Sequence, residues 1–205
     1  MKIEMYPFSF AEFIQYWGST GFETSFREFC CKGGMPGSFE YKSDESRNDY
    51  LKGIYGTIIN RDLISKYKIK NKTILEDLAM FLMDNTGNLS SVNSITNALV
   101  SSSNPITCKT IQNYIDNLTK SYIFYSVSRF DLKGLKYLKT ENKFYLVDHD
   151  FRTSVLGNGN IDTGRIYEDI VYIELLRRGY DVYIGKLYQK EIDFVAIKGS
   201  KKLYI

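Results

Sequence analysis

GRIYEDIVYIELLRRGYDVYIGKLYQKEIDFV, residues 164–195, changes its hydrophobic period partway along. Apolar side chains recur at helical spacing from Ile166 to Leu176, and Gly179 follows them. This pattern predicts a helix over about residues 165–178, because an amphipathic helix buries one stripe and glycine commonly ends it.

Two short runs rich in β-forming residues follow this helix. They cover Tyr180–Ile184 and Ile192–Ile197 and are separated by a polar turn, as two strands of one sheet would be. We therefore expect a helix carrying Glu168 to pack beside a strand carrying Asp193. Two carboxylates delivered in this way are candidate ligands for Mg²⁺, which prefers oxygen ligands and usually keeps several waters.

Several landmarks occur in a fixed order along the chain: Met5–Phe13, Gly33–Pro36, Asn60–Leu63, Gly164-x-x-x-Glu168, Glu174-Leu175-x-x-Arg178-Gly179 and Glu191–Val195. This order resembles the C-terminal domain of a large prokaryotic family of AAA-type ATPases, a domain whose last part is similar to the restriction-endonuclease-like nuclease fold. The resemblance implies an ATP-binding parent protein, of which this chain is the C-terminal portion, attached to an upstream ATPase module. The chain has no Gly-x-x-x-x-Gly-Lys-Ser/Thr phosphate loop, so we expect no ATP site of its own.

In the restriction-endonuclease-like pattern, a helix glutamate, a strand aspartate and a Glu-x-Lys on the next strand cooperate around Mg²⁺. The resemblance assigns Glu168 and Asp193 to the first two positions, as catalytic and metal-binding residues. The third element is not visible, because the chain ends at Ile205 shortly after Lys201-Lys202. We expect a restriction-endonuclease-like domain over residues 160–205 that is incomplete, either through truncation, which the bare final strand favours, or through decay of the site. Glu168 paired with a nearby arginine remains an alternative.

The sequence pattern of residues 69–150 predicts three helices followed by a β-hairpin, which is the element order of a winged helix. The third helix should run over about residues 107–120, and the strands over 122–130 and 144–147, separated by a basic loop, residues 133–143. In such a module the third helix can enter the major groove of double-stranded DNA. The candidate DNA-binding residues lie on this helix and on the loop: Lys109, Gln112, Asn113, Lys133, Lys136 and Lys139.

The sequence pattern of residues 1–68 predicts a helical linker region, which would follow the ATPase core of the parent protein. Ser9 and Glu12 have the spacing of a capping box, and a long helix is expected over about residues 48–68. Together with the later segments, this gives an α+β chain: a helical N-terminal part with a winged helix, then an incomplete α/β domain. Asp148-His149-Asp150 after the hairpin suggests either a metal site or structural capping, and we favour capping.

Composition sets broad limits on function. Lysine and arginine exceed aspartate and glutamate by three, which permits nucleic-acid binding without requiring it. No apolar run approaches the length of a membrane span and no signal peptide is visible, so we expect a cytoplasmic protein without a membrane partner.

Three functional hypotheses remain open. The first is a regulatory or DNA-contacting region of an AAA-type ATPase. The second is a Mg²⁺-dependent nuclease completed by residues beyond 205. The third is a protein-interaction or oligomerisation module.

Overall fold

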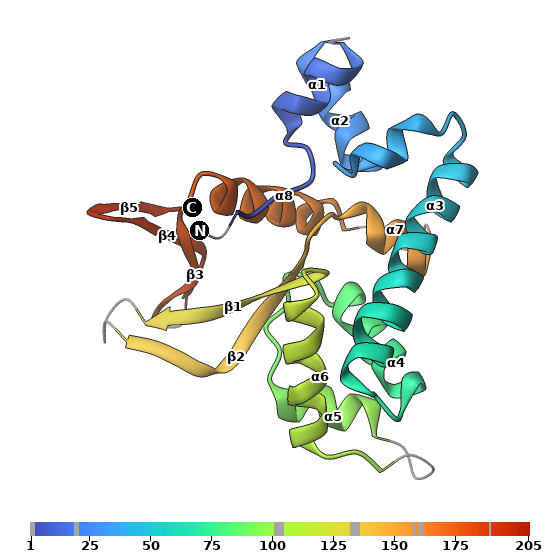
Figure 1. Cartoon of the computed structure of the whole chain (residues 1–205). Coiled ribbons are helices and arrows are strands. Elements are labelled where there is room, and N and C mark those ends of the chain that lie inside the picture. The colour runs from blue at the N-terminus through green and yellow to red at the C-terminus, as the bar shows by residue number, and fades with distance from the viewer. Residues whose placement is uncertain are drawn as a thin grey trace.

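The computed structural model describes residues 3–18, 21–100, 105–131, 136–157, 159, 162–188 and 190–205, and it describes residues 136–140 by their backbone alone. The chain is α+β, as predicted: a helical N-terminal part is followed by a five-stranded mixed sheet (Figure 1). Among the described residues, no helix combines the length and apolar character needed to cross a membrane.

The N-terminal part begins with two helices packed through aromatic rings. They are α1 (Phe10–Trp17) and α2 (Phe22–Lys32), followed by a short 3₁₀ turn, η1 (Pro36–Glu40). The predicted capping box is confirmed: the Glu12 backbone N–H donates to Ser9 Oγ, and the Ser9 N–H donates to the Glu12 carboxylate. The rings of Phe13, Phe29 and Phe39 are buried together and form a small separate core.

The long helix predicted over about residues 48–68 exists but begins earlier. It starts as α3 (Asp44–Thr57), capped by Ser43, and continues as a π-helical stretch, η2 (Ile58–Ser65). The cap explains the earlier start, because Ser43 Oγ accepts the Ser46 backbone N–H and satisfies one exposed donor of the first turn.

Three further helices build the main core. They are α4 (Lys72–Asp84), α5 (Val92–Leu99) and α6 (Cys108–Lys120), and each is preceded by a capping side chain: Asn71, Ser91 or Thr107. Their fully buried leucines include Leu75, Leu78 and Leu118, which pack with residues of α3 and the hairpin. Truncating such a leucine to alanine typically costs about 2–5 kcal/mol, so this cluster carries much of the stability.

The hairpin consists of β1 (Phe124–Asp131) and β2 (Lys136–Leu146), which pair antiparallel. The prediction of a basic loop over residues 133–143 is therefore wrong from Lys136 onward, because β2 already begins there. The residues of β2 have no apolar alternation at this end, but the backbone of β1 pairs with them and holds them in a strand. An isolated bridge between Ser90 and Asn142 joins the connection before α5 to β2. The described order is thus helix, bridge, two helices and hairpin.

The remaining elements complete the sheet and cover one of its faces. They are α7 (Asp150–Leu156), α8 (Thr163–Arg177), β3 (Asp181–Leu187), β4 (Lys190–Lys198) and β5 (Lys201–Tyr204). The strand order is β2-β1-β3-β4-β5, in which β1 and β3 are parallel neighbours. One sheet therefore runs through both the predicted 69–150 and 160–205 ranges.

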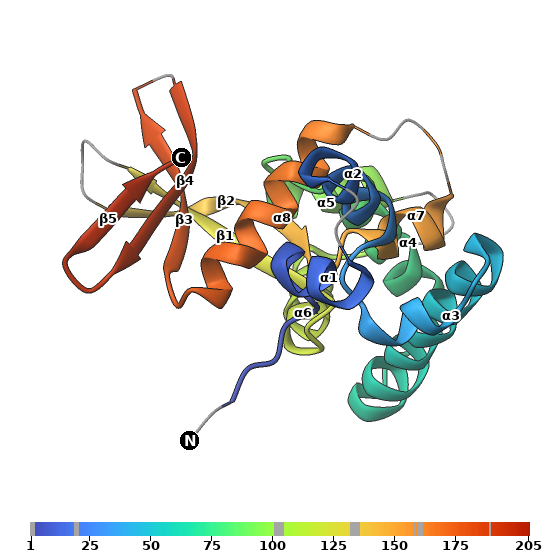
Figure 2. The same ribbon diagram turned by 90° about the horizontal axis from the view of Figure 1, so that it is seen from above.

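Helix α8 packs across this sheet, as Figures 1 and 2 show from two directions. Tyr172 on α8 stacks on Tyr145 of β2 with ring centroids 4.6 Å apart, and its ring also lies 6.0 Å from that of Phe194 on β4. This aromatic contact fixes the face of α8 that carries Glu168 against the strands.

Candidate functional site

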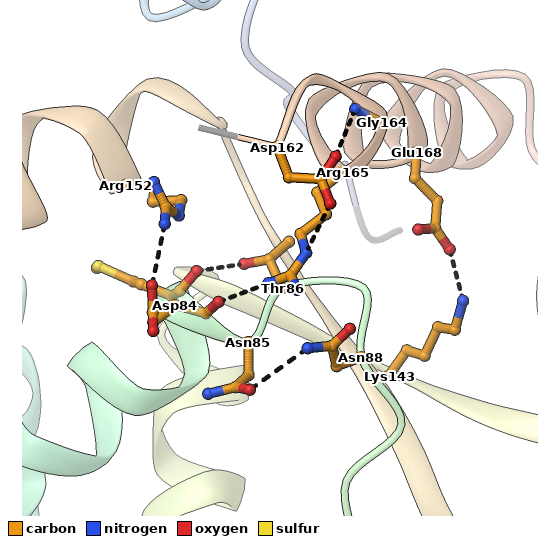
Figure 3. A network of polar contacts seen from close by, with 11 residues as sticks. Asp84, Asn85, Thr86, Asn88, Lys143, Arg152, Asp162, Gly164, Arg165 and Glu168 are labelled. Carbon is orange, nitrogen blue, oxygen red and sulfur yellow. Dashed lines mark hydrogen bonds and ion pairs between the residues drawn. The ribbon is translucent and has the colours of Figure 1, made fainter. Parts of the chain in front are cut away.

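A lysine links the predicted site glutamate to a second glutamate. Lys143 Nζ lies 2.7 Å from Glu168 Oε1 and 2.7 Å from Glu191 Oε1. Tyr145 donates its hydroxyl to the same Glu168 oxygen at 2.7 Å. Figure 3 shows the side chains of Lys143 and Glu168 pointing toward one another. We call these four residues the lysine cluster.

The local structure explains why these side chains meet. Lys143 and Tyr145 are two positions apart on β2, so both lie on the face of the strand that α8 covers. Glu168 reaches them from α8, and Glu191 comes from β4. Gly87 closes one side, because a Cβ added there would lie 2.8 Å from Glu168 Oε2.

Electrostatics favour an ionised lysine and a neutral tyrosine in this cluster. Burial alone would lower the Lys143 pKa, but the hydrogen bonds to Glu168 and Glu191 outweigh burial and raise the pKa above its ordinary value. Burial, followed by the adjacent Glu168 charge, raises the pKa of Tyr145 far above its ordinary value. The tyrosine hydroxyl therefore keeps its proton and donates a hydrogen bond to Glu168.

The two predicted metal ligands lie in different surroundings. Glu168 is mostly covered, whereas Asp193 is exposed on β4. The carboxylate that shares a partner with Glu168 is that of Glu191. Within the described part of the chain, no three His, Cys, Asp or Glu side chains gather closely enough to hold a metal ion. This donor set does not fit Mg²⁺ in its present arrangement, because the ion needs several converging oxygen ligands.

Beside the lysine cluster, a cavity of about 320 Å³ lies between the end of α4, α7 and the start of α8. Arg152 pairs with the Asp84 carboxylate at 2.9 Å, and Arg165 donates to the Asp84 backbone carbonyl at 2.7 Å (Figure 3). Buried Asp169 accepts the Leu146 backbone N–H at 2.8 Å. These contacts tie α7 and α8 to the end of α4, and α8 to β2, so the cavity wall is held by polar side chains.

The Asp148-His149-Asp150 segment makes structural contacts. Asp148 accepts the backbone N–H of Gly34 at 2.6 Å, and a ring nitrogen of His149 lies 3.0 Å from the Phe29 carbonyl oxygen. Asp150 is almost fully buried, and its Oδ2 lies 3.4 Å from Arg47 Nε. The segment therefore connects α7 to α2 and α3.

A basic groove runs along α6 on another part of the molecule. It has a volume of about 540 Å³ and lies between residues 67–71 and the polar face of α6. Lys68, Lys70 and Lys120 line it together with a single acidic residue, Asp116. Asp116 accepts a hydrogen bond from Gln112 at 2.8 Å. The charged side chains that line this groove are therefore predominantly cationic.

Of the six predicted DNA-binding residues, three lie on α6, two lie on β2 and one lies outside the described residues. Asn113 is exposed and lines the groove. Lys109 and Gln112 are exposed on the same helix. Lys133 lies outside the described residues, and the structure describes only the β2 backbone at Lys136 and Lys139.

Sequence reasoning missed the lysines of the groove that precede α4. The signal was present, because lysine occupies every second position from Lys66 to Lys72. Lys143 was also missed, although its spacing from the buried Tyr145 places both residues on one face of a strand.

Comparison with known proteins identifies the family. Residues 23–162 match a family model described as a domain of unknown function (DUF8612), and the chain belongs to this family. An uncharacterized protein of Haemophilus influenzae is 35% identical over 209 residues, covering 100% of this chain and 52% of that protein. Uncharacterized protein MJ1544 of Methanocaldococcus jannaschii is 25% identical over 221 residues, covering 99% of this chain and 48% of that protein.

The chain thus spans about half the length of the curated relatives it matches. No solved structure matches it. The relationship to AAA-type ATPases stays a prediction from the sequence landmarks.

Proposed function

We propose that this chain is a DNA-contacting, C-terminal region of an AAA-type ATPase, without an ATP site of its own. The observation that supports DNA contact is the basic groove along α6. The ATPase parent is supported by the sequence landmarks and is consistent with relatives that are about twice as long as this chain.

The charge of the groove suits a phosphate backbone. Lys68, Lys70 and Lys120 bring three cations to one groove, and Asp116 is held by Gln112 instead of facing a ligand alone. Ammonium groups that neutralise phosphates release counterions, which supplies affinity independent of sequence. The exposed amide of Asn113 adds a group that can hydrogen-bond a base edge or a phosphate.

The element order supports the same proposal. The chain passes through α4, the Ser90 side of the Ser90–Asn142 bridge, α5, α6 and the β1–β2 hairpin, which is the element order of a winged helix. In that module the third helix presents its polar face to the major groove. Here α6 is the third helix, and its polar face forms one wall of the basic groove.

Fluorescence anisotropy with a labelled DNA duplex tests this proposal. If three lysines each neutralise one phosphate, the slope of log K against log salt is about −2.7, and raising salt from about 50 to 200 mM weakens binding about 40-fold. The double variant Lys70→Glu/Lys120→Glu should lose at least two thirds of that slope and most of the affinity.

A matched control is the double variant Lys42→Glu/Lys52→Glu, which makes the same change in net charge at exposed positions outside the groove. It should bind nearly as tightly as the unaltered chain. Absence of binding at low salt, or equal loss in the two double variants, would refute DNA contact through this groove.

A further inference from the structure

The ammonium group of Lys143 lies where two acidic side chains from different elements converge. Glu168 comes from α8 and Glu191 from β4, and one oxygen of each is 2.7 Å from the same nitrogen. The lysine side chain is only 5% exposed. A buried pair of carboxylates needs a positive charge between them, and here the lysine ammonium occupies the position that a metal ion could otherwise take.

The surroundings leave little space for a hydrated ion in addition to this lysine. Glu168 Oε1 already accepts from both Lys143 and Tyr145. Gly87 packs so closely that an added Cβ would lie 2.8 Å from Glu168 Oε2. Mg²⁺ usually keeps several of its waters, and these would compete for the same volume.

We propose that the Lys143 ammonium takes the place of a divalent cation, so that Glu168 and Glu191 form a latent metal site that opens only when this lysine is removed. The lysine acts as a permanent counter-ion that joins the β1–β2 hairpin to α8 and β4. This inference is independent of the proposed DNA contact, because the basic groove shares no residue with the lysine cluster.

The charges explain why the site needs no metal when Lys143 is present and why it would bind one when Lys143 is removed. With Lys143 present, one positive charge offsets two carboxylates, and the site holds together in the absence of metal. Without it, two converging carboxylates are left in a largely covered site, where their like charges repel and either a cation or a proton relieves the repulsion. A divalent ion is the simplest replacement, since it neutralises both groups.

Binding of Mn²⁺ tests the proposal. Free Mn²⁺ would be measured by electron paramagnetic resonance with the metal-stripped full chain, with Lys143→Ala, and with Lys143→Ala/Glu168→Gln. We expect one bound Mn²⁺ per chain in Lys143→Ala, which removes both the charge and the volume of the lysine, and at least tenfold weaker binding in the unaltered chain and in the double variant. A Glu168-dependent Mn²⁺ site in the unaltered chain would overturn the proposal, as would a folded Lys143→Ala variant that binds no Mn²⁺.

A second variant keeps the proposal testable if Lys143→Ala does not fold. Glu168→Gln removes one partner of the lysine, and its melting temperature would be measured in EDTA and in millimolar MgCl₂. We expect an equal fall in both solutions, relative to Glu45→Gln at an exposed position of α3. A fall that appears only with Mg²⁺ present would show that the unaltered site uses metal, and would overturn the proposal.

Discussion

Replacing Asp150 with asparagine should make the stability of the protein less dependent on pH. Asp150 is 1% exposed, and neither of its carboxylate oxygens has a hydrogen-bond partner among the described residues. Burial, reinforced by the adjacent Asp148 charge, raises its pKa from 3.8 to about 7, and Arg47 offsets only part of this rise. The carboxyl group therefore holds its proton in the native protein at pH values where the unfolded chain has released it.

The sign of the effect follows from proton binding. Between pH 3.8 and about 7 the native state binds more protons than the unfolded state at this position, so the stability that Asp150 contributes falls as pH rises. With these two pKa values, the free energy of unfolding should drop by about 2–3 kcal/mol between pH 5 and pH 8 through this residue alone. Asparagine resembles the protonated acid and does not titrate.

Urea unfolding at a series of pH values measures this effect. The unaltered chain and Asp150→Asn should have similar stability near pH 5, and the variant should be the more stable of the two near pH 8. The control is Asp49→Asn, at an exposed position of α3, which should follow the unaltered chain. Parallel pH profiles for the unaltered chain and Asp150→Asn would refute the reasoning, because the buried carboxyl would then not be protonated in the native state.

Two further substitutions test the packing around Glu168. Tyr145→Phe removes a hydrogen bond to a charged acceptor and should lower the free energy of unfolding by about 1.5–3 kcal/mol in chemical denaturation, whereas Tyr204→Phe at an exposed ring should change it little. Gly87→Ala should cost about 1–3 kcal/mol, because Gly87 has a φ of 76° and its new methyl group would approach the Glu168 carboxylate. Equal stability of Gly87→Ala and the unaltered chain would show that this turn can relax.

Helices that bury an apolar stripe could be predicted from the sequence. In α6 the predicted apolar face is confirmed, because Ile111, Tyr114, Ile115 and Leu118 are all buried. The periodic pattern is sufficient here, since one face of the helix packs on the core and the other remains polar.

The hairpin shows where local pattern fails. Strand β2 begins at Lys136 in a polar stretch that has no apolar alternation. Its backbone pairs with β1 over most of its length, so a partner strand decides the structure of these residues. The parallel pairing of β1 with β3 likewise depends on segments far apart in the chain.

The candidate site was predicted in part for the same reason. Glu168 was found from its place on the helix, but its partners are Lys143, Tyr145 and Glu191, which come from two strands. A lysine in a polar segment resembles a solvent-exposed residue until the fold covers it. The metal-binding role predicted for Asp193 gains no support from its exposed position on β4.

The parallel pairing of β1 and β3 also constrains how the chain can fold. Arg129 pairs with Ile184, which lies 55 positions further along the chain (184 − 129), so the segment between them must be closed into a loop before the two halves of the sheet join. The length-dependent part of the entropic cost of closing such a loop is about 3.5 kcal/mol, whereas the hairpin and the helix pairs close over much shorter distances. Local elements can therefore form early, but the β1–β3 junction becomes favourable only once α8 and β3 have been synthesised and ordered. Late contacts of this kind slow folding, and they make the C-terminal strands depend on a hairpin that is already in place.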